Sequence, residues 1–393
     1  MRWTRLFRLF FESEKVGGVL LLLCTILSLI IANSGWGNAY TEFWHIKINL
    51  SFAGLHLNYS IEQWINDGLM TVFFLLVGLE IERELFAGEL SSFSYAILPV
   101  AAAVGGMLVP GTIHFFFNAG TATQKGFGIP MATDIAFAIG ILSLAGKRVP
   151  YSLKVFLTAL AIIDDLGAIV VIALFYNTQI QWLYLGVSAG ILGVLFVLNR
   201  LRVYQLVFYL LPGVVLWYCM MQSGVHPTIA GVLLAFIIPF SGQHSQTPSY
   251  KLQNFLHKPV AFFIVPVFAL ANTSIVLTNG WLTQMKTTNS LGIIAGLVVG
   301  KPTGILLFCW LLIKFGGIHL PHNTKWKSLF GAAILGGIGF TMSIFISNLA
   351  FDKHDLVSYS KIAVLLGSMI ASALGLIVLF NTKKIQEPEE KDQ

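Results

Sequence analysis

The chain has 393 residues, of which 56% are hydrophobic and only 11% are charged, and its formal net charge is +6. Soluble domains carry about 25% charged residues, so this composition excludes a soluble globular protein and indicates a polytopic membrane protein. The positive charge does not indicate nucleic-acid binding, because most Lys and Arg residues lie between apolar runs. The three cysteines show no CxxC spacing, and there is no Walker A or HExxH motif, so we expect neither a cofactor nor an enzyme.

Apolar runs predict an all-α fold with twelve transmembrane helices in one domain, residues 16–381. A helix needs roughly 20 apolar residues to span a bilayer. We expect residues 1–15 to form a cytoplasmic amphipathic N-terminus and residues 382–393 a charged cytoplasmic tail. The predicted spans are about 16–32, 61–81, 95–117, 127–144, 155–176, 183–198, 206–221, 225–240, 260–277, 291–313, 329–349 and 362–380, with a polar loop at 241–258.

Residues 45–59, between the first two spans, predict a small β-hairpin. Polar and apolar residues alternate on both sides of Ala53 and Gly54, which would form the turn. A lone hairpin is marginally stable in water. We therefore expect this hairpin to pair with a second copy and to join a homodimer.

The basic residues predict the orientation of the chain. Twelve spans place both termini on one side of the membrane, and most Lys and Arg residues between the spans fall on that side. By the positive-inside rule, both termini are then cytoplasmic. The basic residues on the other side are Lys47, Lys125, Lys286, Lys353 and Lys361.

The fourth and eleventh spans are predicted to be interrupted, near 127–144 and 329–349. Gly128 and Pro130 weaken the fourth, and the eleventh contains Gly336 and Gly339. Freed backbone groups are tolerated at bilayer depth only beside protein or water. Interrupted helices in matching positions of two halves indicate an ion site near the midplane, where opposed half-helix ends present partial charges. Close helix packing through small residues is the alternative.

Asp134 follows the break in the fourth span directly. Two interpretations stay open at this stage. Its carboxylate could cap a half-helix, or it could be a ligand of the ion.

Two adjacent carboxylates, Asp164 and Asp165, lie in the middle of the fifth span, about 155–176. One ionised side chain at the bilayer centre costs about 2.5–3.5 kcal/mol or more, so the pair predicts an ion or proton pathway. Neighbouring residues point about 100° apart on a helix. We therefore expect one aspartate to face a cavity and the other a neighbouring helix.

Lys301 lies near the middle of the tenth span, too deep for its ammonium group to reach water easily. It predicts an ion pair with one of the two aspartates, as a counter-charge. The alternative is that Lys301 only holds the bundle together. The broken fourth span would bring Thr133 and Asp134 toward the other aspartate.

Two motifs carry a resemblance to a known family. The segments 130–138 (PMATDIAFA) and 159–169 (ALAIIDDLGAI) closely resemble the bacterial NhaA sodium/proton antiporter family. The similarity continues through Val77–Glu80, Ser223–His226, Gly300–Pro302 and Gly339–Phe345. The resemblance implies inverted repeats whose fourth and eleventh spans cross as broken helices, and a homodimer in the bacterial cell inner membrane.

The resemblance also implies roles for the site residues. Asp165 and Asp164 would be the cation- and proton-binding carboxylates, with Asp165 the more direct ligand and Asp164 the partner of Lys301. Thr133 would join them around the transported Na+, and Asp134 would balance partial charges at the crossing. A cytoplasmic pH-responsive funnel would contain Glu80, Arg83, Glu84 and His257. Departures from the family pattern are Glu82, Gln253 and Asn254, which replace a basic residue, an acid and a histidine.

The function expected from this resemblance is electrogenic exchange of cytoplasmic Na+ or Li+ for external H+, regulated by pH. Two alternatives from other classes remain at this stage. An intramembrane aspartyl protease also needs two membrane carboxylates, but its Gly-x-Gly-Asp pattern is absent. A passive cation channel needs a continuous pore, whereas paired broken helices suit alternating access.

Overall fold

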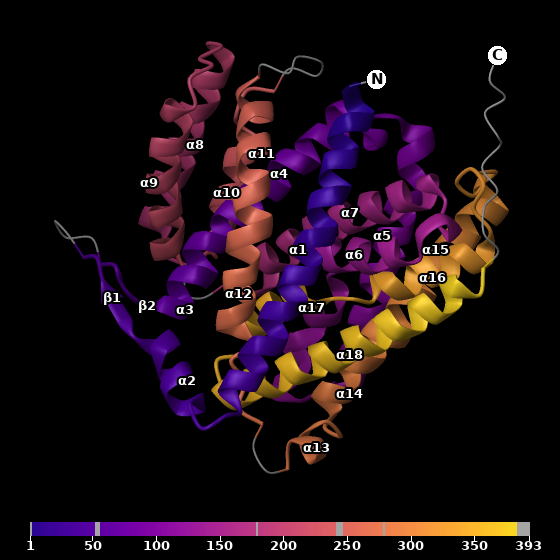
Figure 1. The fold of residues 1–393 in the computed structure, drawn as a ribbon. Helices are drawn as coiled ribbons and strands as arrows, with labels where there is room; N and C mark the ends of the chain where they lie inside the picture. The colour runs from indigo at the N-terminus through magenta and orange to yellow at the C-terminus, as the bar shows by residue number, and fades with distance from the viewer. Residues whose placement is uncertain (1, 52–55, 178–179, 241–246, 278–279, 383–393) are drawn as a thin grey trace.

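The computed structural model describes residues 2–51, 56–177, 180–240, 247–277 and 280–382. They form a mostly helical bundle with one small two-stranded sheet at its side (Figure 1). Seven helices in the described part are long and apolar enough to cross a membrane, and there are up to ten such spans if each bent helix pair counts as one. This is the architecture of a multi-span membrane protein.

The helices and strands follow one another along the chain as expected for such a bundle. In chain order they are α1 Arg2–Ala32, α2 Gly37–His45, β1 Lys47–Asn49, β2 Asn58–Ser60, α3 Ile61–Gln63, η1 Trp64–Leu69, α4 Met70–Ala87, η2 Glu89–Ser91, α5 Phe93–Phe117, η3 Ala122–Met131, α6 Ile135–Leu144, η4 Gly146–Arg148, α7 Tyr151–Phe175, α8 Trp182–Arg200, α9 Val207–Ser223, α10 Thr228–Ala235, α11 Pro248–Pro259, η5 Val260–Ile264, α12 Val265–Asn272, α13 Trp281–Gln284, α14 Thr288–Ala295, η6 Gly296–Gly300, α15 Lys301–Gly316, α16 Trp326–Gly336, α17 Phe340–Ala350 and α18 His354–Phe380.

Two predicted boundaries in the middle of the chain were wrong. The predicted eighth span, 225–240, is an α-helix only from Thr228 to Ala235, too short to span a bilayer at about 1.5 Å per residue. The region predicted as a polar loop at 241–258 contains α11, which begins at Pro248 and continues through η5 into α12. The Thr247 hydroxyl accepts from the Tyr250 N–H at 3.4 Å, and proline is favoured at the first helical position.

The predicted hairpin is present as an antiparallel pair. Lys47 is opposite Ser60, Ile48 opposite Tyr59, and Asn49 opposite Asn58. The predicted turn at Ala53 and Gly54 lies outside the described residues. The side chain of Ser60 then caps α3, accepting from the Gln63 N–H at 3.2 Å, so the second strand leads directly into the α4 span.

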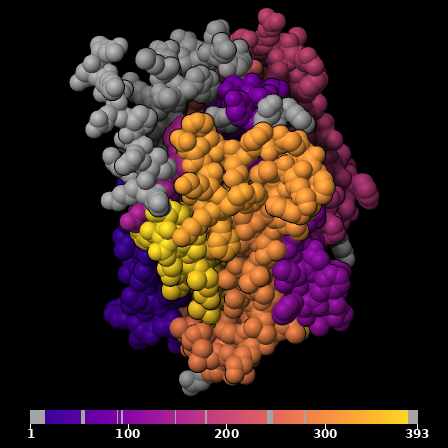
Figure 2. Space-filling model, turned by 90° about the vertical axis from the view of Figure 1, so that its right-hand side faces the viewer, coloured from indigo at the N-terminus to yellow at the C-terminus, as the bar shows by residue number. Residues whose placement is uncertain are grey.

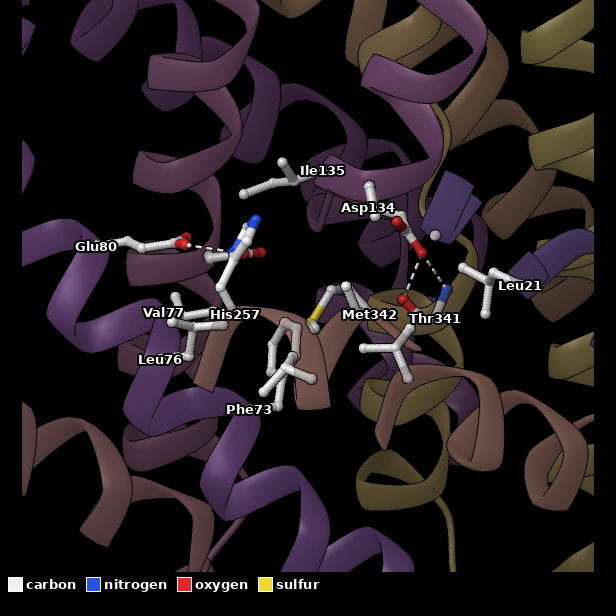
Figure 3. A pocket seen from close by; sticks show the side chains of 16 residues that line it. Leu21, Phe73, Leu76, Val77, Glu80, Asp134, Ile135, His257, Thr341 and Met342 are labelled. Carbon is white, nitrogen blue, oxygen red and sulfur yellow. Dashed lines mark hydrogen bonds and ion pairs between the residues drawn. The ribbon is translucent and has the colours of Figure 1, made fainter. Parts of the chain in front are cut away.

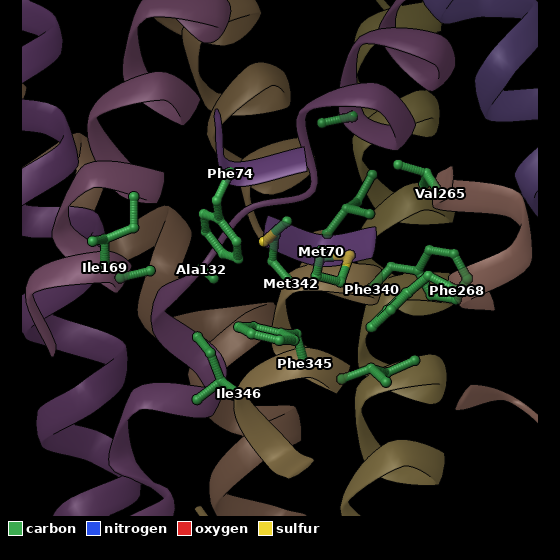
Figure 4. Packing of buried hydrophobic residues seen from close by; sticks show 14 of the residues in the cluster. Met70, Phe74, Ala132, Ile169, Val265, Phe268, Phe340, Met342, Phe345 and Ile346 are labelled. Carbon is green, nitrogen blue, oxygen red and sulfur yellow. The ribbon is translucent and has the colours of Figure 1, made fainter. Parts of the chain in front are cut away.

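The centre of the bundle is an apolar core formed by α4, α12 and α17. Phe345 of α17 lies 5.4 Å from Phe74 of α4 and 6.3 Å from Phe268 of α12, measured between ring centroids. Figure 4 shows these rings in one packed cluster with Met70 and with Phe340 and Met342 of α17. All of these side chains are buried, and we name Phe74, Phe268 and Phe345 the aromatic layer.

The outer surface of the bundle is rich in exposed apolar side chains. Orange and yellow residues of the C-terminal third form the centre of the face in Figure 2, and Phe315, Phe330 and Ile377 of this third are exposed. Large exposed apolar surfaces mark interaction with a membrane or another protein. Here the exposed apolar side chains lie on a bundle whose helices are long enough to cross a membrane, as expected for surfaces that face lipid.

Candidate functional site

Helix α7 carries the two acids into the interior of the bundle. Asp164 is 0% exposed and Asp165 is 1% exposed, and most of the other residues from Leu153 to Ile172 on this helix are buried as well. The two side chains leave the helix in different directions and meet different partners. This separation agrees with the expectation from helical geometry.

Asp164 has a cationic and a polar partner, both at its Oδ2 atom, whereas its buried Oδ1 atom has no hydrogen-bond partner in the described residues. Its Oδ2 atom lies 2.8 Å from the Lys301 ammonium group and accepts a hydrogen bond of 2.7 Å from the Thr133 hydroxyl. The ion pair predicted for Lys301 is therefore formed with Asp164. Since Lys301 is 0% exposed, the pair is a buried one, in which each charge compensates the other.

The backbone before Lys301 explains how its ammonium group reaches this position. Residues Gly296–Gly300 form a π-helical turn inside the long helix, and α15 begins at Lys301 with Pro302 in its first turn. Such turns occur often at functional sites. The Lys301 ammonium group also donates to the Met131 carbonyl, so α15 is joined to the fourth predicted span as well as to α7.

Both predicted interruptions are present, and they touch each other. The axis bends by 47° between η3 and α6 and by 41° between α16 and α17. The Asp134 N–H donates to the Ile338 carbonyl at 2.7 Å, and the Thr133 hydroxyl, whose single hydrogen is shared with Asp164, lies 2.8 Å from the Gly336 carbonyl oxygen. Carbonyls freed by the eleventh span thus find donors in the fourth.

Asp134 closes the crossing by capping two helices at once. Its Oδ1 atom accepts from the Phe137 N–H at 2.9 Å at the start of α6. Its Oδ2 atom accepts from the Thr341 N–H at 3.1 Å at the start of α17, and from the Thr341 hydroxyl. Two helix N-termini, each carrying a partial positive charge, therefore face one carboxylate. Of the two interpretations left open, the structure shows the cap.

Gly339 directly precedes α17 at this point. A Cβ atom added there would lie 3.0 Å from Leu297 and would clash with the Ser343 hydroxyl. At Gly339 both interpretations therefore apply. The helix is interrupted there, and a small residue is also needed because the two broken helices pack closely.

We expect Asp134→Ala to lower the melting temperature of the purified protein by several degrees. Loss of one side-chain cap costs about 0.5–2 kcal/mol, and here two helices lose their acceptor. Asp134→Asn keeps an oxygen acceptor and should lose less. Thermal unfolding in detergent, with the exposed Asp352→Ala as control, measures the effect, and equal melting temperatures for Asp134→Ala and Asp352→Ala would contradict the double cap.

Asp165 lines a cavity of about 70 Å³. Figure 3 shows this cavity, with Asp134 and Thr341 on one side and Glu80 and His257 on the other. Asp134, Thr341, Glu80 and His257 line the same space. The Oδ1 atom of Asp165 is buried and has no hydrogen-bond partner in the described part of the chain. A buried carboxylate that lines a small cavity and has one oxygen without a donor can accept a proton or bind a cation.

One prediction about the arrangement was wrong. Thr133 was expected beside the aspartate that does not pair with Lys301, but its hydroxyl contacts Asp164, the partner of Lys301. The reason is the crossing itself: the Thr133 hydroxyl must also reach the Gly336 carbonyl, on the side of α7 where Asp164 points. Asp134 does line the cavity of Asp165.

The expected funnel residues form two pairs near the end of α4. Glu80 Oε1 lies 3.8 Å from His257 Nδ1, and both residues line the cavity. Arg83 and Glu84 form a neighbouring ion pair at 2.8 Å. Of the three departing residues, Gln253 hydrogen-bonds Glu80, Glu82 accepts from the Ser249 hydroxyl at 3.1 Å, and Asn254 is exposed.

Sequence reasoning missed three polar residues in the core. Thr341 shares Asp134, and Ser368 of α18 accepts from the Phe340 N–H at 3.1 Å. Lys361, placed in a loop by the sequence, is buried inside α18. Its signal was available, because Asp355 in the first turn indicates a helix that begins well before Lys361.

The chemistry of the cavity suits a hard cation. No group of three or more His, Cys, Asp or Glu side chains within the described residues could hold a metal ion, and the polar atoms around Asp165 are mainly carboxylate and hydroxyl oxygens. Such oxygens suit hard cations, whereas transition metals favour imidazole and thiolate.

The sequence profile of a family described as Na+/H+ antiporter 1 matches residues 8–379. The chain belongs to this Na+/H+ antiporter family. It is 56% identical to the Na(+)/H(+) antiporter NhaA of Cytophaga hutchinsonii over 384 residues, which cover 98% of this chain and 97% of that protein. It is 57% identical to the NhaA of Dechloromonas aromatica over 380 residues, 96% of each chain.

More distant members of the Na+/H+ antiporter family align over a similar length. The NhaA of Escherichia coli strain E24377A is 48% identical over 370 residues, covering 93% of this chain and 95% of that protein. The match therefore includes both broken helices and α7, and it confirms the family suggested by the motifs around Asp134 and Asp165.

Proposed function

We propose that this chain is a secondary active transporter that exchanges Na+ for H+ at Asp165. The observation that carries the proposal is the division of the acid pair. Asp164 is paired with Lys301 at 2.8 Å and does not line the cavity, whereas Asp165 lines it; the buried Oδ1 atom of Asp165 has no hydrogen-bond partner in the described residues. The family's name supports the choice of ions.

Competition at one carboxylate supplies the coupling. A carboxylate must lose its proton to bind a cation, so cation affinity depends on pH. At low cytoplasmic pH, protonated Asp165 binds Na+ weakly; as the pH rises, Na+ or Li+ displaces the proton. One site that holds either ion, and that opens to one side at a time, exchanges the two.

Direction follows from the ion gradients. Protons bind to the site from the outside, because the proton-motive force drives them inward. They are then released into the cytoplasm, where Na+ takes their place in the site. If each cycle moves more protons than cations, it is electrogenic, and the membrane potential contributes about 2.3 kcal/mol per charge per 100 mV.

Other residues have supporting roles in this proposal. Asp164 and Thr133 complete the cation's surroundings, and Lys301 is the counter-charge of Asp164. Gly336 and Gly339 allow the crossing, which Asp134 balances. Glu80, Arg83, Glu84 and His257 form the pH-responsive funnel, supported by the shared cavity of Asp165, Glu80 and His257.

The finer architecture is part of the proposal. Residues 16–381 form one domain of twelve spans in two inverted repeats, in a bacterial inner membrane with both termini cytoplasmic. Helix α9 and the apolar segment 225–240, of which only α10 is α-helical, would supply the two passages beyond the ten counted by length and composition. The contact between the bent helix pair η3–α6 and the bent helix pair α16–α17 supports the two inverted repeats, since each pair is interrupted at the point where it contacts the other.

We further propose that the hairpin joins a homodimer. Replacing residues 48–57 by a Gly-Ser linker, with the Ser60 cap of α3 retained, should convert a dimer into a monomer in detergent, because the exposed strand edges then have no partner copy. Light scattering measures the mass. A variant that stays dimeric at the same concentration would contradict this role, and Na+-dependent proton movement provides the folding control.

The alternatives have no support in the family match. A hydrolase motif of the form GxSxG does occur at 186–190, but it lies inside α8, where the Ser188 hydroxyl donates to the Tyr184 carbonyl at 2.9 Å. A nucleophile elbow needs a strand-to-helix turn. Transport of Na+ against its concentration gradient distinguishes an antiporter from a passive channel, which cannot perform it.

Fluorescence of a pH dye in everted membrane vesicles tests the proposed exchange. Respiration acidifies the vesicle interior and quenches the dye. We expect added Na+ or Li+ to restore the fluorescence, and to do so more at alkaline than at acidic pH. Equal responses to Na+ and K+, or no response above vesicles that lack the protein, would overturn the proposal.

A further inference from the structure

A second buried cation, Lys361, lies in a polar cluster away from the acid pair. Its ammonium group lies 3.6 Å from Glu62 Oε1 and donates to the Asn272 side-chain oxygen at 3.4 Å. The same Asn272 oxygen accepts from Asn348 at 2.6 Å and from Asn66 at 3.4 Å. We name these five residues the outer cluster. It joins α18, α17, α12 and the α3–η1 segment.

The outer cluster lies at a fixed level along three helices. On α17, Thr341 lines the cavity, Phe345 belongs to the aromatic layer, and Asn348 belongs to the cluster. About 10 Å of helix separates Thr341 from Asn348 at 1.5 Å per residue. The cluster therefore lies beyond the aromatic layer, on the side away from the cavity.

Helices α12 and α4 repeat the same order. On α12, Val265 lines the cavity, Phe268 lies in the layer and Asn272 in the cluster. On α4 and η1, Val77 lines the cavity, Phe74 lies in the layer and Asn66 in the cluster.

The surroundings of the outer cluster place it at the end of the bundle opposite the cavity. Glu62 Oε2 lies 3.7 Å from His45 Nδ1 of α2, and Figure 1 shows α2 and the hairpin far from the N-terminus. Glu62 is partly exposed, with 22% of its side chain accessible, whereas Lys361 is 9% exposed at its side chain. The cluster thus connects the aromatic layer with the surface at that end.

We propose that the outer cluster is the closed outer gate of the transport cycle, with Lys361 as a tethered cation that holds α18 against Glu62 and Asn272. The proposal rests on the antiport function proposed above. An exchanger must open its site to the outside, and the only polar contacts between these helices at this level in the described residues are those of the cluster. Outward opening separates Lys361 from Glu62 and Asn272.

The gate has a specific physical consequence. An ion pair and shared amide contacts stabilise the closed state alone, so their loss shifts the population toward the outward-open state. A differential contact of this kind typically changes such an equilibrium 5- to 150-fold, about 1–3 kcal/mol. The loss should be visible as access to residues just inside the cluster.

Thiol labelling from the outer side tests the gate. Ser347 of α17 is 0% exposed and lies between the layer and the cluster, so Ser347→Cys reports access. In right-side-out proteoliposomes we expect a membrane-impermeant maleimide to label this cysteine slowly. Adding Lys361→Gln should raise the labelling rate about tenfold, or about 1.4 kcal/mol. The chain without the added cysteine gives the background from Cys24, Cys219 and Cys309.

Matched variants separate the gate from a general loss of structure. Lys353→Gln removes an exposed lysine at the start of the same helix and should leave labelling unchanged. Glu62→Gln removes the partner at a partly exposed position, and should raise labelling relative to the exposed Glu42→Gln even if Lys361→Gln fails to fold. Combining Glu62→Lys with Lys361→Glu should restore slow labelling.

The outcomes are distinct from those of the antiport assay, because labelling requires no transport. Faster labelling than in the matched controls in both Lys361→Gln and Glu62→Gln, or in Glu62→Gln alone where Lys361→Gln fails to fold, supports the gate. Labelling at the control rate in folded Glu62→Gln overturns it, whatever the antiport activity.

Discussion

Replacing Asp165 by asparagine is expected to reduce Na+-driven proton movement to the level of protein-free vesicles. The amide cannot take up a proton and carries no charge to balance Na+, yet it has nearly the same size. Asp165 is buried and lines the cavity, and its Oδ1 atom has no hydrogen-bond partner in the described residues. The substitution therefore removes the exchange chemistry while disturbing few contacts.

A stability measurement separates this effect from misfolding. Loss of a buried charge that has no hydrogen bond at Oδ1 should leave the protein as stable as before or more stable. Asp352→Asn, at an exposed position, is the matched control and should keep full activity. If Asp165→Asn retained Na+-driven proton movement in proteoliposomes, the assignment of the site to Asp165 would fail.

Lys301→Met is expected to destabilise the protein by about 3–5 kcal/mol, because removing one partner leaves the other charge buried and unpaired. The unpaired group is Asp164, 2.8 Å from the ammonium group in the native protein. The Met131 carbonyl loses a donor as well. Denaturant or thermal unfolding in detergent measures the change, and Lys314→Met, at an exposed position on the same helix, should have little effect.

A double-mutant cycle then identifies Asp164 as the partner. Adding Asp164→Asn to Lys301→Met neutralises the uncompensated carboxylate, so the pair of substitutions should cost less than the sum of the single ones. Strictly additive losses would show that Lys301 stabilises the bundle through other contacts. The cycle thereby decides between the counter-charge and the purely structural interpretation of Lys301.

The features predictable from sequence are those in which burial of charge leaves few solutions. Lys301 and the acid pair lie in apolar runs where an unpaired charge is costly, so their pairing could be inferred without coordinates. The breaks near Pro130 and Gly336 follow from local backbone chemistry. The hairpin follows from alternating residues at 47–49 and 58–60.

Other features depend on tertiary contacts that no local pattern encodes. The crossing decides that Thr133 contacts Asp164, because one hydroxyl reaches both that carboxylate and the Gly336 carbonyl. Asp355 could have placed Lys361 inside a helix, but no local pattern identifies its partners Glu62 and Asn272, which come from segments far away in the chain. The length of α10 was overestimated because residues 236–240 are as apolar as a helix core but do not continue the helix.

The central claim is that one site exchanges Na+ for H+, and sodium accumulation in proteoliposomes tests it most directly. Vesicles with an acidic interior are diluted into alkaline buffer containing a trace of radioactive Na+. We predict that wild-type protein accumulates Na+ above its external concentration, that a protonophore abolishes the accumulation, and that Asp165→Asn shows none. Na+ that only equilibrates across the membrane, independently of the pH gradient, would contradict the account.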